Sequence, residues 1–181
     1  MKQEIRIIGG QYRGKKLHFP DIEGLRPTPD RVRETVFNWL MHDIRGARCL
    51  DAFAGSGALG FEAFSRGASQ VVFVEQSPLA HANLQKIISS FNSPILKLFK
   101  MDARAFLQSC KEQFDMIFLD PPFAHNYLPQ CIQELTTKDI LVPGGLVYLE
   151  SPTLIELDEQ SWRTVKLKKA GQVIYGLFEK L

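Results

Sequence analysis

Short apolar runs alternate with amphipathic stretches along most of the chain. Five such runs lie between residues 48 and 151, and a segment with helical spacing of apolar residues follows each of the first four. The runs are CLDAF, QVVFVEQ, ILKLFKM, FDMIFLD and GLVYLES. Strands that alternate with helices predict a doubly wound α/β fold with a mostly parallel sheet.

The two ends of the chain follow a different pattern. Residues 4–19, EIRIIGGQYRGKKLHF, alternate around a Gly-Gly pair and predict a β-hairpin. Residues 162–180 form two alternating runs around a tight turn, so we expect an antiparallel pair that makes the sheet mixed, with seven strands. Residues 20–29 read as a loop, and we expect Thr28 to cap a helix that has Pro29 at its first position.

Composition places the chain among ordinary globular proteins. It has 181 residues, of which 45% are hydrophobic and 23% are charged. No apolar run approaches the roughly 18 residues that span a bilayer, and the charged start MKQEIRIIGG is not a signal peptide. The three cysteines and four histidines are scattered without ligand spacing, so neither a disulfide framework nor a metal site is predicted. We expect a cytoplasmic monomer that makes no membrane contact.

Charge is distributed unevenly along the chain, although the net charge is only +2. Residues 1–48 carry ten Lys/Arg against six Asp/Glu, and residues 163–181 carry five against one. Residues 49–162 carry seven against thirteen. A mixed, solvated surface would explain this distribution, but two basic ends around an acidic centre also suit contact with a polyanion.

A glycine turn, DAFAGSG at residues 51–57, follows the first strand of the alternating region and opens a helix. Gly55 and Gly57 allow unusual backbone angles and the close approach of a ligand. With Gly60 they match the G-x-G-x-x-G pattern of a dinucleotide site, so NAD has to be considered. Asp51 argues against NAD, because a diphosphate at a helix N-terminus is favoured by the positive helix dipole and disfavoured by a nearby carboxylate.

Acidic residues end three successive strands: Asp51, Glu75 and Asp102. Open α/β sheets bind ligands at the carboxyl ends of their strands, so the three acids predict an electronegative cleft. S-adenosylmethionine carries a sulfonium and an ammonium and suits such a cleft better than a diphosphate does. Glu75 suits a ribose diol in either cofactor, and Asp102 an adenine amino group. Helix N-capping is the competing interpretation for Asp51 and Asp102.

The stretch FLDPPF, residues 118–123, places an acid on a stiff turn. A strand cannot continue through Pro121 and Pro122, because both lack an N–H and fix φ. Asp120 then offers its carboxylate, beside a rigid peptide carbonyl, to the two N–H bonds of an exocyclic base amine. Two acceptors return the delocalised lone pair to the nitrogen, and such positioning can supply about 7–11 kcal/mol of the barrier. Phe123 would stack on the base, a contact that contributes about 1–3 kcal/mol.

These motifs carry a resemblance to a known family. DAFAGSG with Glu75, Asp102, Ala103 and LDPPF resembles the S-adenosylmethionine-dependent amino-methyltransferases. The blocks IRIIGGQYRGKKL, LRPTPDRVRETVFNWL, DAFAGSGALGFEA and AGQVIYGL narrow the resemblance to the bacterial RsmD family, whose members methylate the 2-amino group of one guanine in 16S ribosomal RNA. The resemblance implies a Rossmann-like class I methyltransferase domain, residues 29–181, and an N-terminal β-hairpin extension that binds RNA, residues 1–28. It implies 16S RNA or the 30S particle as partner.

The resemblance also implies roles for single residues. The cofactor would be held by Asp51, Phe53, Ala54, Gly55, Gly57, Glu75, Gln76, Asp102, Ala103 and Thr28. The catalytic corner that takes the guanine would be Asp120, Pro121, Pro122 and Phe123. RNA would be bound by the basic residues Arg6, Arg13, Lys15, Lys16, Arg26, Arg31, Arg33, Lys168 and Lys169, for each of which a solvated surface position is the competing interpretation. The segment RPTPDRVRE would close over the cofactor or the RNA.

Other functions share parts of this pattern. A DNA or RNA amino-methyltransferase of the adenine N6 or cytosine type would use the same Asp-Pro-Pro-Phe turn, although 181 residues leave little room for a target-recognition region. A protein glutamine methyltransferase would typically start the turn with Asn. An NAD-binding protein and a non-catalytic RNA-binding factor remain the alternatives from other classes.

Overall fold

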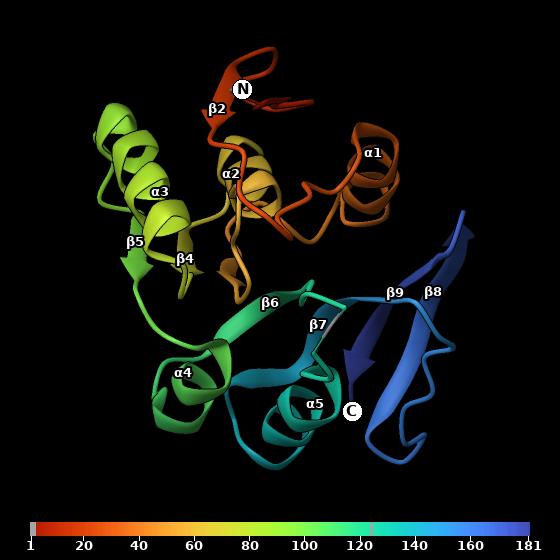
Figure 1. The fold of residues 1–181 in the computed structure, drawn as a ribbon. Helices are drawn as coiled ribbons and strands as arrows, with labels where there is room; N and C mark the ends of the chain where they lie inside the picture. The colour runs from red at the N-terminus through yellow and green to blue at the C-terminus, as the bar shows by residue number, and fades with distance from the viewer. Residues whose placement is uncertain (1–2, 124) are drawn as a thin grey trace.

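A mixed seven-stranded sheet organises the protein, whose computed structural model describes residues 3–123 and 125–181 (Figure 1). The strands stand in the order β5-β4-β3-β6-β7-β9-β8. The first five of these are parallel to one another, and β9 is antiparallel to both β7 and β8. The elements in chain order are β1 (Gln3–Arg6), β2 (Lys16–Phe19), α1 (Asp30–Trp39), β3 (Arg48–Asp51), α2 (Ala58–Ser65), β4 (Gln70–Val74), α3 (Pro78–Phe91), β5 (Leu96–Phe99), α4 (Ala103–Ser109), β6 (Phe114–Leu119), α5 (Leu128–Thr137), β7 (Leu141–Ser151), β8 (Trp162–Ala170) and β9 (Val173–Lys180). The predicted doubly wound mixed sheet is confirmed.

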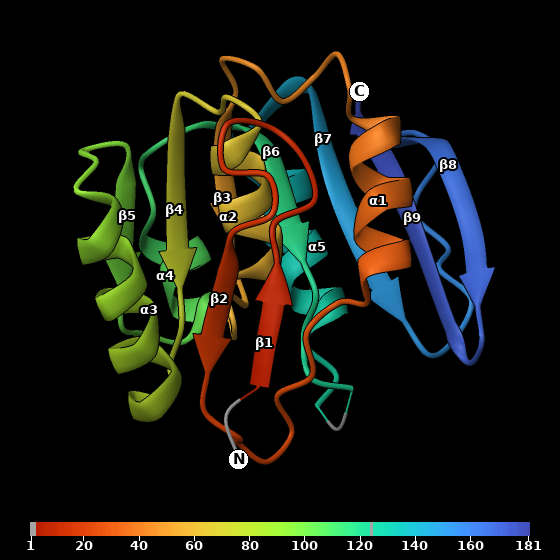
Figure 2. The ribbon, with the colours of Figure 1, turned by 90° about the horizontal axis from the view of Figure 1, so that it is seen from above.

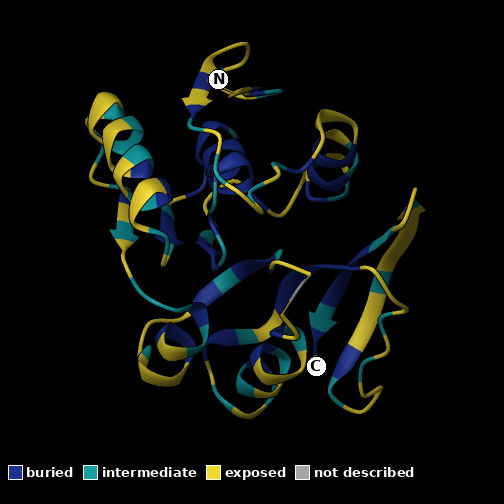
Figure 3. Cartoon of the chain, viewed as in Figure 1, coloured by how far each residue is buried: buried dark blue, intermediate teal, exposed yellow. Residues whose placement is uncertain are grey.

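Helices cover both faces of the sheet (Figures 1 and 2). α1, α2, α3 and the β1–β2 hairpin lie on one face, and α4 and α5 lie on the other. Successive residues of a central strand serve opposite faces: Cys49 belongs to the core under α1–α3, and Leu50 to the core over α4 and α5. Both are completely buried, as expected for a sheet sandwiched between helices. Figure 3 shows the same division, with buried central strands and exposed outer helix surfaces.

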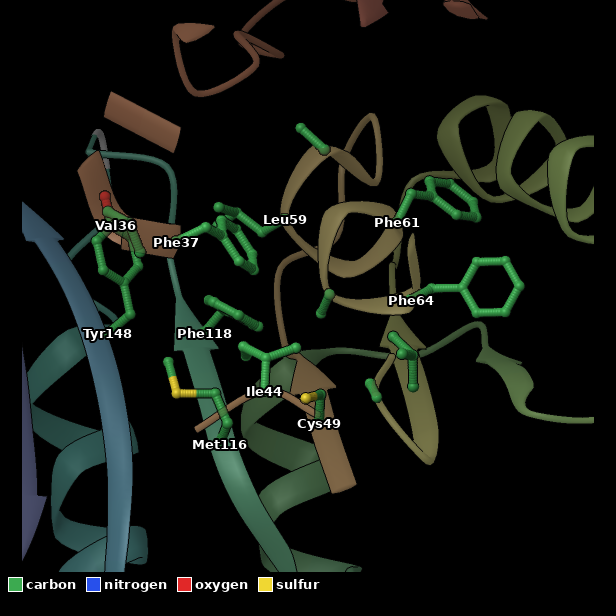
Figure 4. Packing of buried hydrophobic residues seen from close by; sticks show 14 of the residues in the cluster. Val36, Phe37, Ile44, Cys49, Leu59, Phe61, Phe64, Met116, Phe118 and Tyr148 are labelled. Atoms are coloured by element: carbon green, nitrogen blue, oxygen red, sulfur yellow. The ribbon is translucent and has the colours of Figure 1, made fainter. Parts of the chain in front are cut away.

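Aromatic side chains fill the core between α1 and the sheet (Figure 4). Phe37 of α1 packs on Phe118 of β6, with ring centroids 5.7 Å apart. Phe118 in turn lies 6.3 Å from the ring of Tyr148 on β7. This stack holds α1 over β6, whose carboxyl end carries the Asp-Pro-Pro-Phe turn, and over the neighbouring strand β7. It therefore also positions the segment that precedes α1.

The predicted N-terminal hairpin is present and is packed onto the main body. β1 and β2 pair antiparallel, with Ile5 opposite Leu17, and both side chains belong to the core under α1–α3. Ser65 at the end of α2 holds the hairpin loop: its hydroxyl donates to Gly9 O at 2.6 Å and accepts from Tyr12 N at 2.9 Å. The boundary between extension and methyltransferase domain after residue 28 stays a prediction.

A buried carboxylate ties the same hairpin to two helices. Glu62 on α2 is fully buried and accepts from the backbone N–H groups of Ile8 and Gly9, each at 2.9 Å. It also forms ion pairs with Arg33 of α1 at 3.3 Å and with Arg66 at 2.8 Å. Two cations and two peptide N–H groups therefore satisfy a charge that would otherwise be costly in the core.

Two local expectations were wrong. α1 begins at Asp30 with Pro29 as its N-cap and without a side-chain cap, because the Thr28 hydroxyl points to the sheet and donates to Asp120 Oδ2 at 3.2 Å. β7 begins at Leu141 rather than at Gly145, since an irregularity in its pairing with β6 accommodates the proline and glycines that precede the predicted strand. No helix within the described residues is long and apolar enough to cross a membrane.

Candidate active site

A cavity of about 670 Å³ opens at the carboxyl edge of the sheet, within the range of small-molecule sites. Its walls come from the loops after β3, β4, β5 and β6, from Glu150 near the end of β7, and from residues 22–29, which form the segment between β2 and α1. The predicted residues that line it are Arg26, Thr28, Asp51, Phe53, Ala54, Gly55, Glu75, Gln76, Asp102, Ala103, Asp120, Pro121, Pro122 and Phe123. Residues from five loops thus meet in one place.

The reversal of strand order brings the glycine turn next to the proline turn. β3 stands between β4 and β6, so the chain after β3 leaves the sheet at the point where the crossovers change direction. Ala52 N, just past β3, donates to Phe118 O of β6 at 3.2 Å, and Ala54 N donates to Val74 O of β4 at 3.0 Å. The turn is therefore hydrogen-bonded to both neighbouring strands, and its residues Ala52 and Ala54 line the cavity.

The two glycines of the turn have different roles. Gly55 has a φ of +54°, lines the cavity, and donates its N–H to Glu75 Oε1 at 2.8 Å. Gly57, with a φ of +82°, does not line the cavity, and a Cβ there would lie 2.4 Å from the Phe61 ring. Gly57 is therefore not part of the cavity wall, where we expected it to contact the cofactor. The start of α2 requires a glycine at this position.

Asp51 both caps a helix and lines the cavity. Its Oδ2 accepts from Gly60 N at 3.0 Å, so the N-terminus of α2 is already occupied by a carboxylate where a dinucleotide diphosphate would sit. Burial raises the pKa of Asp51 to about 7, against the lowering effect of the Gly60 N–H, and the charges of Asp120 and Glu75 raise it further. Crowded carboxylates of this kind favour a cationic ligand.

The other two strand-end acids are also engaged by the protein. Glu75 receives the N–H groups of Gly55 and Ser77, each at 2.8 Å, which leaves lone pairs on both oxygens for a ribose diol. Asp102 caps α4 and is held by Arg104, whose guanidinium donates to both of its oxygens at 3.1 and 2.8 Å and lowers its pKa. The role of Asp102 toward adenine stays a prediction, because Arg104, which sequence reasoning missed, uses much of its acceptor capacity.

The Asp-Pro-Pro-Phe corner presents an acceptor and an aromatic face. Asp120 accepts from the Thr28 hydroxyl, and burial raises its pKa against the lowering effect of its hydrogen bonds. Pro121 is buried, whereas the Phe123 side chain is 47% exposed although it is a large apolar group. An exposed aromatic at the mouth of a cavity is free to stack on a planar ligand.

Glu150 is the site residue that sequence reasoning missed most clearly. It lines the same cavity as Asp120 and is only 6% exposed. Burial and the neighbouring Asp120 charge raise the pKa of Glu150 well above its ordinary range. The signal was present, since an acid at the end of an apolar strand is the same feature that identified Asp51 and Asp120.

The predicted RNA-binding residues fall into two groups. Eight of them are exposed: Arg6, Arg13, Lys15, Lys16, Arg26, Arg31, Lys168 and Lys169. Arg33 is 1% exposed and donates to Glu62, to Asp30 and to the backbone carbonyls of Arg6 and Thr28. Its assignment to RNA binding was wrong, because its guanidinium is enclosed by partners inside the fold. No group of His, Cys, Asp and Glu in residues 3–123 and 125–181 is arranged to hold a metal ion.

A doubly wound sheet with this strand order, an acidic glycine turn and an Asp-Pro-Pro-Phe corner at its carboxyl edge defines a Rossmann-like class I methyltransferase. A family model described as "Conserved hypothetical protein 95" matches residues 5–179. The chain belongs to this family, the RsmD family.

Relatives and solved structures agree with this membership. "Ribosomal RNA small subunit methyltransferase D" of Haemophilus influenzae is 42% identical over 183 residues, which cover 98% of this chain and 95% of the relative. The protein of the same name from Escherichia coli is 41% identical over 179 residues, covering 98% and 90%. A solved structure described as a putative methyltransferase from Escherichia coli superposes with a TM-score of 0.89 at 40% identity and covers 98% of both chains.

Proposed function

We propose that this protein transfers a methyl group from S-adenosylmethionine to the exocyclic 2-amino group of a guanine in 16S ribosomal RNA of the small subunit. The observation that carries the proposal is the meeting of Asp51, Glu75 and the Asp120–Phe123 corner in one cavity. The ribosomal substrate is supported by relatives that are 41% and 42% identical and are named small-subunit ribosomal RNA methyltransferases.

The residues around the glycine turn suit the methyl donor. S-adenosylmethionine supplies an electrophilic methyl group, because its sulfonium leaves as a neutral thioether when a nitrogen takes the methyl carbon. Asp51, crowded by Asp120 and Glu75, provides negative potential that a sulfonium and an ammonium relieve. Glu75 offers lone pairs to the ribose hydroxyls, and Gly55 permits close backbone approach.

The proline corner acts on the amine. The Asp120 carboxylate accepts one N–H of the 2-amino group, and the rigid peptide carbonyl beside it accepts the other, which localises the lone pair on nitrogen. Once the N–C bond has formed, the nitrogen is cationic and its extra proton passes to Asp120. Burial raises the pKa of Asp120, and a carboxylate with a raised pKa is the better proton acceptor. Phe123 stacks on the guanine ring from the exposed mouth of the cavity.

The basic surface would bring RNA to this edge of the sheet. Arg6, Arg13, Lys15 and Lys16 are exposed on the hairpin, and Arg26 lies in the cavity wall. Phosphate contacts of this kind orient RNA without reading its sequence. The target guanine has to be unpaired or flipped out, because the 2-amino group inside a stack cannot reach Asp120.

Methyl transfer to ribosomal RNA tests the proposal directly. The protein is incubated with labelled S-adenosylmethionine and either 16S RNA or 30S particles from a strain that lacks the gene, and the nucleosides are analysed by mass spectrometry. We expect N2-methylguanosine. Label in methyladenosine, or no labelled guanosine with either substrate, would overturn the assignment.

Variants link the activity to the corner. Asp120→Ala should lower kcat by about 10²–10³-fold, the usual effect of removing one group that stabilises developing charge. Glu159→Gln, an exposed acid outside the cavity wall, serves as the matched control and should keep the wild-type rate.

A further inference from the structure

Glu150 has no part in the proposed chemistry, yet the sheet places it beside the catalytic carboxylate. Phe118 of β6 lies opposite Tyr148 of β7 in the parallel ladder, and both side chains point into the same core (Figure 4). Two residues further on come Glu150, still within β7, and Asp120, the first residue after the end of β6. Since side chains two apart lie on the same face of a sheet, these two carboxyls project from the same face at the same edge.

The two carboxyls share an enclosed site. Both line the cavity, and each carboxyl alters the pKa of the other. Within residues 3–123 and 125–181 neither forms an ion pair with Lys, Arg or His. Two ionised carboxylates cannot remain in contact in a buried place without a cation, so the pair retains one proton. The Thr28 hydroxyl donates to Asp120 and so favours its ionised form, which leaves the proton with Glu150, and burial of Glu150 acts in the same direction.

The groups around the pair fit this arrangement. From the loop before α1, Thr28 donates to Asp120 Oδ2 at 3.2 Å. From β7, the Tyr148 hydroxyl finds no partner in the described residues, and burial, followed by the charges of Glu150 and Asp120, raises its pKa. From the end of β3, Asp51 adds a further negative charge that interacts with Asp120. The negative charge of Asp51 favours keeping the proton, whereas the Tyr148 hydroxyl favours the ionised form of Glu150, an effect smaller than that of burial.

We propose that Glu150 is a positioning residue: as a neutral carboxylic acid it donates a hydrogen bond to the Asp120 carboxylate and, together with Thr28, fixes that carboxylate toward the amine. The inference rests on the proposed function, because it assigns Glu150 a part in the same transfer. Two donors from different elements stop the carboxylate from rotating about its side-chain bond, which a single donor would not achieve.

The shared proton also sets the charge of the pair. Before the reaction the pair carries one proton and a charge of −1, and afterwards it carries two protons and is neutral, the second being the proton that leaves the methylated amine. A pair without a proton would carry −2 beside Asp51, and a pair with two protons could not accept one. Glu150 therefore keeps Asp120 ionised while it limits the negative charge that the cavity has to hold.

Two substitutions separate hydrogen donation from the simple presence of a side chain. Glu150→Gln keeps an N–H donor of the same shape and should retain most of kcat. Glu150→Ala removes the donor and should lower kcat about 10²-fold, the cost expected of a misplaced catalytic group, with the KM for S-adenosylmethionine unchanged. Glu159→Gln is again the control. Wild-type kcat in Glu150→Ala, or equal losses in the alanine and glutamine variants, would refute the proposal.

Infrared spectroscopy of the RNA-free protein reads the proton itself. Wild type at a pH of about 8.5, above the pKa of about 7 of Asp51 and below the pKa of about 10 of Glu150, should show the carbonyl stretch of a protonated carboxylic acid, shifted in D₂O, and Glu150→Gln should lack it. A band that persists in Glu150→Gln, or no such band in wild type, would overturn the inference even if Glu150→Ala failed to fold. Because this measurement needs no RNA substrate, it decides the state of Glu150 separately from the methylation assay that decides the proposed function.

Discussion

Glu62 offers a sharp test of how the N-terminal hairpin is held, because one carboxylate satisfies four separate groups. Its Oε1 accepts from Ile8 N at 2.9 Å and from Arg33 at 3.3 Å, and its Oε2 accepts from Gly9 N at 2.9 Å and from Arg66 at 2.8 Å. Glu62→Ala leaves the guanidinium of Arg33, which is 1% exposed, without its fully buried partner. Removing one member of a buried ion pair costs about 3–5 kcal/mol.

We therefore expect Glu62→Ala to lose about 3–5 kcal/mol of unfolding free energy. The measurement is equilibrium urea unfolding, followed by fluorescence and by circular dichroism in parallel so that two-state behaviour is checked. Glu62→Gln, which keeps the shape and one acceptor but loses the charge, should fall between Glu62→Ala and wild type.

Glu4→Ala is the matched control on the same hairpin. Glu4 is paired with Lys16 at 3.6 Å, and about half of each side chain is exposed to solvent, so the pair is screened. Its loss should cost no more than about 1 kcal/mol. The reasoning would be refuted if Glu62→Ala were destabilised no more than Glu4→Ala, since that would mean that water replaces all four partners of the buried carboxylate at little cost.

Three further outcomes follow from the same structure. Gly57→Ala should lower the free energy of unfolding by about 1–3 kcal/mol more than Gly24→Ala does. Both glycines have φ near +80°, but only at Gly57 would a Cβ meet a ring atom, at 2.4 Å. Equal losses of stability in thermal or urea unfolding would contradict this. Asp51→Asn should become more stable relative to wild type as pH rises from 3.8 to about 7, because the raised folded-state pKa means that ionisation of Asp51 destabilises the fold in this pH range. Each pH unit contributes about 1.4 kcal/mol to the difference in stability. A difference in urea midpoint that does not change with pH would count against this prediction. Lys168→Ala should reduce the slope of log K against log salt for RNA binding by about 1, whereas Lys111→Ala, exposed before β6, should leave it unchanged.

The fold was predictable where the backbone is constrained locally. Pro121 and Pro122 end a strand whatever surrounds them, and the glycines at 55 and 57 adopt the positive φ angles that their turn requires. Because such signals fall at strand ends, they located the carboxyl edge of the sheet and most of the cavity wall together. The start of β7 was missed for the same reason: a Pro-Gly-Gly sequence normally breaks a strand, but here it forms an irregularity, with Gly144 at a φ of +82°, between Leu141 and Leu146, which both pair with β6.

The site residues that escaped prediction depend on partners far away in the sequence. A lone Arg is usually exposed, so Arg33 was placed on the surface, yet Glu62 lies 29 residues further on, in a helix whose eight residues are all buried. Thr28 had the right type and position for a helix cap, but Asp120 lies 92 residues away and takes its hydroxyl instead. Local propensity cannot resolve a competition between two hydrogen-bond partners of one side chain when one of them is supplied by the fold.

These distant partners form one continuous set of contacts between the hairpin and the reaction centre. Glu62 binds the hairpin backbone and Arg33; Arg33 Nε donates to the Thr28 carbonyl at 3.2 Å; and the Thr28 hydroxyl donates to Asp120 at 3.2 Å. Glu62, which holds the hairpin in place, is therefore linked through Arg33 to Thr28, the donor that orients the proposed catalytic carboxylate. In the proposed arrangement Glu150 approaches the same carboxylate from β7, so Asp120 is supported by the segment before α1 on one side and by the sheet on the other, and displacement of the hairpin would act on the first of these two supports alone.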